Sequence, residues 1–393
     1  MKKACLSFVF LVYVLQSVSS QNLEFSVYSQ VSILTAGPGD HLYEAFGHSA
    51  IRVKDPLLKI DHVFNYGVFD YSRPNFYGNF VRGRLEYFLS VRRFNQFIVD
   101  YKRNGRWMKE QILDLTKKEK EAIFHFLRSN AQPENAYYLY DPYFNNCSTK
   151  IRDIVQDLLH GVVELSDDYL KSGMTMRKLM NKELPWNTWG NFGINLALGN
   201  QLDQEINFEE YMYLPDYLYL SLKNAKKIED GITKPLVKAE IIILDFNEKK
   251  TAISWINPLF VFSMLFLLSV IITYKDMKRG DNSKWLDFSI LFTSGLIGVL
   301  IIFLWFFTDH KTAPNNFNIL WGFTPNLIMA FFLFKKKRPV WLSTYFKVCL
   351  CLIVVLFALW VTRIQLFSMA LLPILGLLTI RYWYLSRLLT FKK

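Results

Sequence analysis

The distribution of apolar residues divides the chain into two parts near residue 250. Beyond that point, five runs are apolar over about 20 residues each, the length that a helix needs to cross a bilayer. The sequence therefore predicts five membrane spans, at approximately 252–274, 286–307, 317–334, 340–361 and 364–385. The third run is the weakest, because Pro325 interrupts it. A single run is also compatible with a buried core helix, but five in succession favour a helical membrane domain over residues 251–393.

Residues 21–250 show shorter and more mixed patterns. Three segments rich in β-branched and aromatic residues, separated by Gly-Pro-Gly and Asp-Pro turn signals, predict short strands at 31–35, 49–53 and 62–66. These strands are close together in the sequence, so they predict a small antiparallel sheet.

Two helices are predicted in the same part of the chain. Thr116 is followed three residues later by a glutamate, which is typical of a capping box and predicts a helix through Leu127. Apolar residues share one helical face from Ser148 to Leu159, and Gly161 supplies a stop signal. Strands and helices together indicate an α+β domain.

The N-terminus carries the pattern of a secretory signal peptide over residues 1–20. Two lysines precede a short apolar run at 6–15, and small residues follow it before Gln21. The run is shorter than a membrane span requires, so we expect cleavage. An uncleaved N-terminal anchor is the alternative.

Charge gives the expected orientation in the membrane. The net charge of +12 does not indicate nucleic-acid binding, because the basic residues bracket the apolar runs. They concentrate after the first span, after the third span and in the C-terminal tail: Lys275, Lys278, Arg279, Lys284, residues 335–338, Arg387, Lys392 and Lys393. By the positive-inside rule these segments are cytoplasmic. The sequence thus predicts a multi-pass protein of the inner (cytoplasmic) membrane, with residues 21–250 in the periplasm and the C-terminus in the cytoplasm.

Cysteine usage directs attention to one thiol. Cys5 lies in the expected signal peptide, and Cys349 and Cys351 lie in the fourth span, so Cys147 is the only cysteine of the mature N-terminal domain. It stands at the start of a predicted helix, where the dipole favours a thiolate and free N–H groups can hold an oxyanion. A small buried core residue is the alternative, but the polar neighbours, including Asn146, favour a nucleophile.

A thiolate nucleophile needs a base, and His48 is the best candidate. It follows a glycine and begins a predicted strand, which is a rigid mount. Asn65 and His62, on the next predicted strand, are alternative third members that would orient the imidazole. The sequence has no phosphate-loop, dinucleotide-binding or metal-ligand spacing, so we expect no cofactor and no metal.

Several segments resemble the lipoprotein N-acyltransferase (Lnb) family of Bacteroidota. They are FGHSAIRV at 46–53, NYGVFD at 65–70, NNCST at 145–149, WGNFG at 189–193, LPD at 214–216, DHKT at 309–312 and NILW at 318–321. The order His, polar residue, Cys also resembles permuted papain-like domains of the NlpC type and of lecithin:retinol acyltransferase. The resemblance implies an α+β permuted papain-like periplasmic domain followed by the helical membrane domain.

The resemblance also implies a reaction. A fatty acyl chain would move from a membrane phospholipid, through a Cys147 thioester, to the N-terminal amine of a diacylglyceryl-cysteine lipoprotein. Arg52, Tyr66 and His310 lie in the matching segments and are the residues we expect at the substrates. The partners would be phospholipid, diacylated lipoprotein and membrane, with no nucleic acid. A papain-like peptidase or amidase acting on the cell wall, and a non-enzymatic membrane sensor, remain as alternatives.

Two groups of surface candidates have alternative readings. A basic set is expected either to meet lipid phosphates or to be a solvated face: Arg82, Arg84, Arg92, Arg93, Lys102, Arg103 and Arg106. A tyrosine run is expected either at the level of the lipid headgroups or in the core: Tyr211, Tyr213, Tyr217 and Tyr219.

Overall fold

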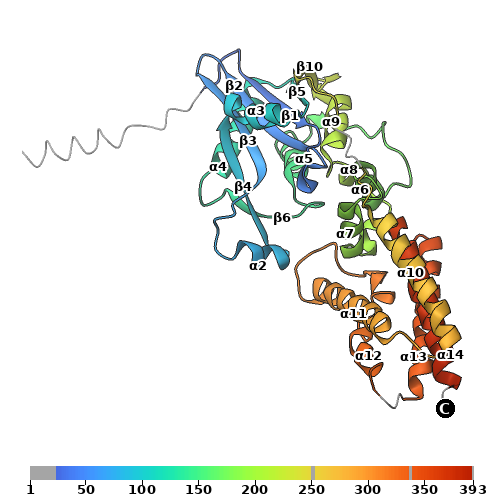
Figure 1. Ribbon diagram of the computed structural model, residues 1–393. Coiled ribbons are helices and arrows are strands. Elements are labelled where there is room, and N and C mark those ends of the chain that lie inside the picture. The colour runs from blue at the N-terminus through green and yellow to red at the C-terminus, as the bar shows by residue number, and fades with distance from the viewer. Residues whose placement is uncertain (1–23, 249–252, 336–338, 392–393) are drawn as a thin grey trace, which may run out of the picture.

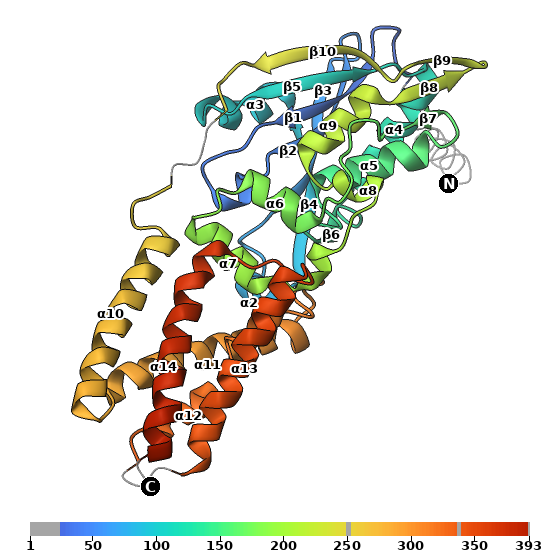
Figure 2. The same cartoon turned by 90° about the vertical axis from the view of Figure 1, so that its right-hand side faces the viewer.

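The computed structural model describes residues 24–248, 253–335 and 339–391. An N-terminal α+β domain stands at one end of an elongated molecule, and a bundle of helices forms the other end (Figures 1 and 2). The expected signal peptide, residues 1–20, lies outside the described residues.

A seven-stranded sheet organises the N-terminal domain, and every pair of neighbouring strands is antiparallel. Its strands, in spatial order, are β10 (Val237–Leu244), β5 (Met108–Leu113), β1 (Gln30–Ala36), β2 (His48–Asp55), β3 (Ile60–Phe69), β4 (Leu85–Arg93) and β6 (Tyr137–Tyr140). The strands predicted at 31–35, 49–53 and 62–66 are confirmed as parts of β1, β2 and β3. A second, three-stranded sheet contains β7 (Val163–Glu164), β8 (Lys226–Glu229) and β9 (Ile232–Pro235).

Helices cover both faces of the large sheet. On one face, α4 (Lys117–Asn130), α5 (Cys147–Leu158) and α9 (Pro215–Asn224) pack against side chains such as Ile33 and Ile51. On the other face, α3 (Phe94–Arg103) packs against the alternate positions, such as Leu34 and Ala50. Both predicted helices are confirmed, and Thr116 caps α4 with the reciprocal bonds of a capping box.

Smaller elements complete the domain. They are η1 (Leu42–Glu44), α2 (Phe76–Val81), α6 (Met176–Glu183), α7 (Trp189–Ala197), η2 (Asn200–Asp203) and α8 (Phe208–Tyr211). In the tyrosine run, Tyr211 and Tyr213 are 4% and 3% exposed and belong to a hydrophobic cluster around α6. These two residues therefore belong to the core, and the alternative prediction, which placed them at the level of the lipid headgroups, is wrong for them.

Among the described residues, four helices are long and apolar enough to cross a membrane, not five. They are α10 (Pro258–Arg279), α11 (Lys284–Phe306), α13 (Trp341–Val361) and α14 (Leu372–Phe391), the last preceded by the single turn η4 (Met369–Leu371). The predicted third span is a broken segment made of η3 (Phe317–Leu320) and the short α12 (Asn326–Phe332). It still runs the length of the bundle, because Asn318 bonds to α7 at one end and Phe334 packs on Trp285 at the other.

The break in the third segment has a local cause and a tertiary one. Pro325 has no backbone N–H and disfavours helix at the residue before it. The chain also approaches α11 very closely here, since a Cβ added to Gly298 would lie 2.0 Å from the carbonyl oxygen of Gly322. The segment therefore packs against α11 as two short pieces rather than as one continuous helix.

The N-terminal domain is hydrogen-bonded to the bundle through α7. The amide of Asn316 donates to the carbonyl oxygen of Leu196 (2.7 Å), and the backbone N–H of Gly199 donates to Thr312 (2.8 Å). Phe192 and Leu196 pack against the bundle's apolar core. Figure 2 shows α7 between the two parts of the molecule. These contacts fix the orientation of the sheet relative to the membrane helices.

Candidate active site

Strands β2 and β3 separate next to the start of α5. The β2–β3 ladder ends at the Ile51–Phe64 pair, although both strands continue beyond it. A bulge between Asn65 and Val68 interrupts the ladder from β3 to β4 at the same level. Gly67 in this bulge has a φ of +86°, and a Cβ added there would lie 3.8 Å from the Cβ of Cys147. The first residue of α5 thus lies where β2 and β3 separate.

Asn146 fixes the position of Cys147 by capping α5. Its side-chain oxygen accepts hydrogen bonds from the backbone N–H groups of Ser148 (2.8 Å) and Thr149 (3.0 Å). Its amide nitrogen donates to the carbonyl oxygen of Tyr213 (2.8 Å). Cys147 is 8% exposed. Because the cap occupies the N–H groups of Ser148 and Thr149, the expectation that the first-turn N–H groups hold an oxyanion is wrong for these two.

His48 lies beside Cys147 at the start of β2. The imidazole and the Cys147 thiol are close enough for each to shift the pKa of the other, and the backbone N–H of Ser49 also lowers the pKa of the thiol. The Nε2 atom of His48 is 2.5 Å from the Oδ1 atom of Asn65. Because an amide oxygen only accepts, Nε2 carries the proton, and Nδ1 is the nitrogen available to the thiol. The three side chains form the chain Cys147–His48–Asn65.

The electrostatics of this pair favour an ionised thiol. Burial raises the pKa of Cys147, but the charge of His48 and the hydrogen bond from it outweigh burial and lower that pKa to about 7. Burial lowers the pKa of His48, while the charge of Cys147 and the hydrogen bonds to Cys147 and Asn65 raise it above its usual value. Both shifts stabilise a thiolate–imidazolium pair, which is the reactive form of a cysteine nucleophile.

The other predicted site residues lie elsewhere. His62 pairs with Val53, five residues along β2 from His48, or roughly 16 Å at the rise of a strand. Arg52 is 7% exposed and forms ion pairs with Asp61 (2.8 Å) and Glu110 (3.1 Å). These bonds make Arg52 part of the domain's interior rather than a free contact for a substrate.

Tyr66 and His310 are also engaged in structural contacts. Tyr66 is 2% exposed, and its hydroxyl accepts a hydrogen bond from the amide of Asn130 (2.8 Å). His310 lies in the loop after α11 and packs against Gly83, where an added Cβ would be 2.6 Å from the His310 backbone nitrogen. The loop that holds His310 contacts the segment between α2 and β4.

The sequence indicated no role for Tyr138 and Tyr140, and it placed Arg106 only in the basic set that was expected either at lipid phosphates or on a solvated face. Both tyrosines have their pKa raised, chiefly by burial and also by the charge of Cys147, which places them near the thiol. Arg106 is 6% exposed; it donates to the carbonyl oxygen of Gly37 (2.8 Å) and forms an ion pair with Glu44 (3.2 Å). Its charge also lowers the pKa of His48. No motif in the sequence marks these residues, because the sheet and its loops bring them together.

Within the described parts of the chain, no group of three or more His, Cys, Asp or Glu side chains is arranged to hold a metal ion. The side chains beside the start of α5 offer nucleophilic and acid–base chemistry through a thiol, an imidazole and an amide.

Comparison with known families gives two matches. The model described as the Lnb N-terminal periplasmic domain matches residues 21–189, and the model described as the Lnb transmembrane domain matches residues 248–393. No curated protein and no solved structure matches the chain. The two models cover most of the sequence, in the order that the fold shows.

Proposed function

The chain belongs to the Lnb family, and from that premise we propose that it is a lipoprotein N-acyltransferase that works through a thioester on Cys147. It is a multi-pass membrane protein with a periplasmic α+β domain followed by a helical transmembrane domain. The observation that carries the proposal is the Cys147–His48–Asn65 arrangement, held on a domain that is hydrogen-bonded to membrane helices.

In the first step the Cys147 thiolate attacks the carbonyl carbon of a phospholipid ester. The S–C bond forms and the ester C–O bond breaks, and the lysophospholipid alkoxide takes the proton from the His48 imidazolium. The backbone N–H of Cys147 itself, which the Asn146 side chain does not occupy, is the helix-start donor that can hold the oxyanion. Asn65 keeps the imidazole ring oriented throughout.

In the second step the acceptor's N-terminal amine attacks the thioester. The N–C bond forms, the S–C bond breaks, and neutral His48 takes the proton that the amine loses, which regenerates the thiolate–imidazolium pair. Donor and acceptor both have acyl chains in the same leaflet, so a domain fixed at that leaflet replaces a three-dimensional search by a local one. Transfer competes with hydrolysis, so the burial of Cys147 away from water favours transfer.

The two other readings are less well supported. A peptidase or amidase of the cell wall also uses a Cys–His pair, but a soluble polymer does not require a catalytic domain attached to a bundle of spanning helices. A non-enzymatic sensor does not require a thiol whose pKa is lowered to about 7 beside a histidine.

We also propose that the protein lies in the inner membrane with its C-terminus in the cytoplasm. Lys278 and Arg279 end α10, at the end of the bundle far from the N-terminal domain, and basic residues mark cytoplasmic loops. Reporter fusions at Lys278 should be active in the cytoplasm, and fusions at Thr312 should be active in the periplasm. A cytoplasmic Thr312 would contradict this orientation.

The reaction is tested by complementation in a strain that lacks its own N-acyltransferase. The wild-type chain should convert diacylated lipoproteins to the triacylated form, and Cys147→Ala should abolish the conversion. Cys351→Ala is the matched control, because this exposed cysteine lies in the bundle on α13. Purified wild-type protein given phospholipid without acceptor should show an acyl mass on the Cys147 peptide. Unchanged lipoproteins together with an altered muropeptide profile would favour the peptidase instead.

A further inference from the structure

A continuous row of aromatic rings runs from the site to α2. We define the aromatic row as Tyr140, Tyr87, Phe69 and Phe76. Tyr140 lies next to the site, because a Cβ added to Gly67 would be 3.3 Å from its ring and 3.8 Å from the Cβ of Cys147. From there the ring centroids are 4.4 Å (Tyr140–Tyr87), 5.4 Å (Tyr87–Phe69) and 6.4 Å (Phe69–Phe76) apart. Each ring contacts the next, so the row has no break.

Strand pairing keeps the row on one face of the sheet. Phe69 on β3 lies opposite Tyr87 on β4, and residues directly opposite in antiparallel strands present their side chains to the same face. All four members are only partly buried. Buried residues of the same strand, Leu85 and Leu89, lie on either side of Tyr87.

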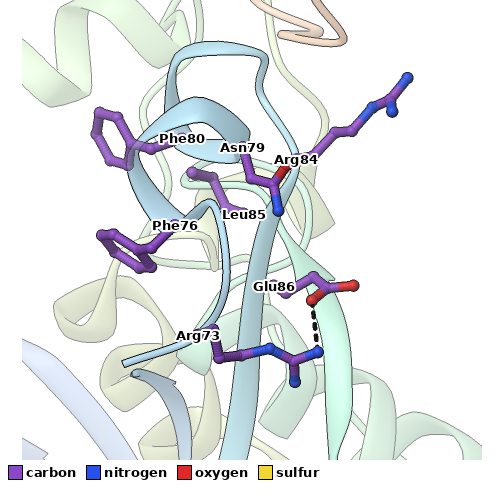
Figure 3. Close-up of a pocket in the computed structure, with 7 residues that line it drawn as sticks. All are labelled: Arg73, Phe76, Asn79, Phe80, Arg84, Leu85 and Glu86. Atoms are coloured by element: carbon purple, nitrogen blue, oxygen red, sulfur yellow. Dashed lines mark ion pairs between the residues drawn. The ribbon is translucent and has the colours of Figure 1, made fainter. Parts of the chain in front are cut away.

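The outer end of the row carries aromatic side chains exposed to solvent. Tyr71 is 60%, Tyr77 is 73% and Phe80 is 49% exposed. Figure 3 shows Phe76 and Phe80 on one side of α2, with Asn79 and Arg84 on the other side. Exposed aromatic rings beside arginines are typical of protein segments that lie at the headgroup level of a membrane.

This end of the row is fixed to the membrane bundle. The backbone N–H of Asp309 donates to the carbonyl oxygen of Arg82 (2.8 Å), and Arg84 forms an ion pair with Asp309 (2.7 Å). Asp309 lies three residues beyond Phe306, the last residue of α11, which is 65% exposed. Both views of the molecule place α2 at the end of the bundle that faces the N-terminal domain (Figures 1 and 2). α2 therefore lies at the level where a spanning helix leaves the bilayer.

We propose that α2 docks into the membrane interface and that the aromatic row is the surface along which a phospholipid acyl chain passes from the leaflet to Cys147. The inference rests on the proposed acyltransferase function and names the path of its donor. Apolar rings give a long acyl chain an unbroken low-polarity surface, and Arg82 and Arg84 lie where a lipid phosphate would remain. Of the basic residues that the sequence suggested as phosphate contacts, Arg82 and Arg84 would therefore lie at the lipid, whereas Arg106 is buried inside the domain.

The test uses the full-length protein in lipid nanodiscs and two reactions at the same thiol. The first is acylation of Cys147 by a long-chain phosphatidylethanolamine, followed by mass spectrometry. The second is alkylation of Cys147 by iodoacetamide, a small soluble reagent that does not need the row. The double variant Tyr77→Ser, Phe80→Ser should slow acylation about tenfold, since less apolar surface meets the lipid. Alkylation should keep its wild-type rate, because both residues are exposed and far from the core.

Matched controls are Tyr28→Ser and Phe126→Ser, which are 64% and 39% exposed and lie away from α2. They should leave both rates unchanged. Phe69→Ala, inside the row, should slow acylation as well, and a phospholipid with a diazirine in its acyl chain should label Tyr87 and Phe76. If wild-type Cys147 is alkylated but never acylated, the proposed function fails. If wild-type Cys147 is acylated and the double variant matches it, or the controls slow it equally, the function stands and the aromatic row is overturned.

Discussion

Two clusters of buried polar side chains in this molecule are both held by hydrogen-bond partners, one in the bundle and one in the N-terminal domain, but the partners differ in kind. In the bundle, Arg381 is 1% exposed and donates hydrogen bonds to Asp287 (2.8 Å), Asp276 (3.1 Å) and Thr273 (2.8 Å). Asn282 completes the shell of Asp287 (2.8 Å). These partners are permanent, and polar groups inside a membrane protein need such partners because no water replaces them.

The cluster in the N-terminal domain is partnered less completely. Asn65 gives His48 one fixed bond, but the other partner of His48 is the Cys147 thiol, whose protonation can change. Burial and pairing thus produce a stabilising ion-pair cluster around Arg381 and a reactive pair of side chains at Cys147. Burial of polar groups therefore does not by itself indicate an active site. A partner that can gain or lose a proton, such as the Cys147 thiol, does.

The largest expected effect is the loss of stability when the ion-pair cluster around Arg381 is broken. Arg381→Met would leave Asp276 and Asp287 as buried charges without their cation, and it should lower the free energy of unfolding by about 3–5 kcal/mol. Thermal unfolding in detergent measures this loss. Arg387→Met, at an exposed position on the same helix, should have little effect.

A triple variant sharpens the same test. Replacing Arg381, Asp276 and Asp287 together by Met, Leu and Leu removes the charges as a group and should recover much of the lost stability. If Arg381→Met alone were as stable as the wild type, the ion-pair cluster would not stabilise the bundle.

The next effect concerns the orientation of His48. Asn65→Ala should slow acylation of Cys147 about 10- to 100-fold, because the imidazole loses the acceptor that holds its tautomer. Asn65→Asp keeps an acceptor oxygen and should recover part of the rate. His62→Ala is the matched control and should keep the wild-type rate, since His62 lies opposite Val53. The reverse pattern would make His62 the third member.

The smallest effect is a shift in pH dependence. With the pKa of Cys147 at about 7, the thiolate fraction and the alkylation rate should rise as the pH increases through 7 and level off above it. The variant His48→Ala lacks the charge and the hydrogen bond that lower the pKa of Cys147, while burial still raises it. The inflection should therefore move to higher pH. Iodoacetamide rates measured from pH 5 to 10 report both curves. An inflection that does not move in His48→Ala would mean that His48 does not activate the thiol.

Local patterns were sufficient for much of the fold. Segments rich in β-branched and aromatic residues between turn signals predicted β1, β2 and β3. A capping box predicted the start of α4, and apolar periodicity predicted α5 with Cys147 at its start. Four of the five predicted spans are long helices, although α10 begins at Pro258 rather than near 252, because Asn257 caps it. These features depend on residues within a few positions of one another, and such short-range interactions can be read from the sequence.

Tertiary structure decided the rest. The choice between Asn65 and His62 depends on where β2 and β3 separate, and the sequence does not specify that register. The engagement of Arg52 depends on Glu110, 58 residues away, and the aromatic row needs β3, β4 and β6 to pair. The broken third segment depends on the contact of Gly298 with Gly322 as well as on Pro325. In each case the deciding interaction joins residues that are distant in the chain, and only the packed fold sets their separation.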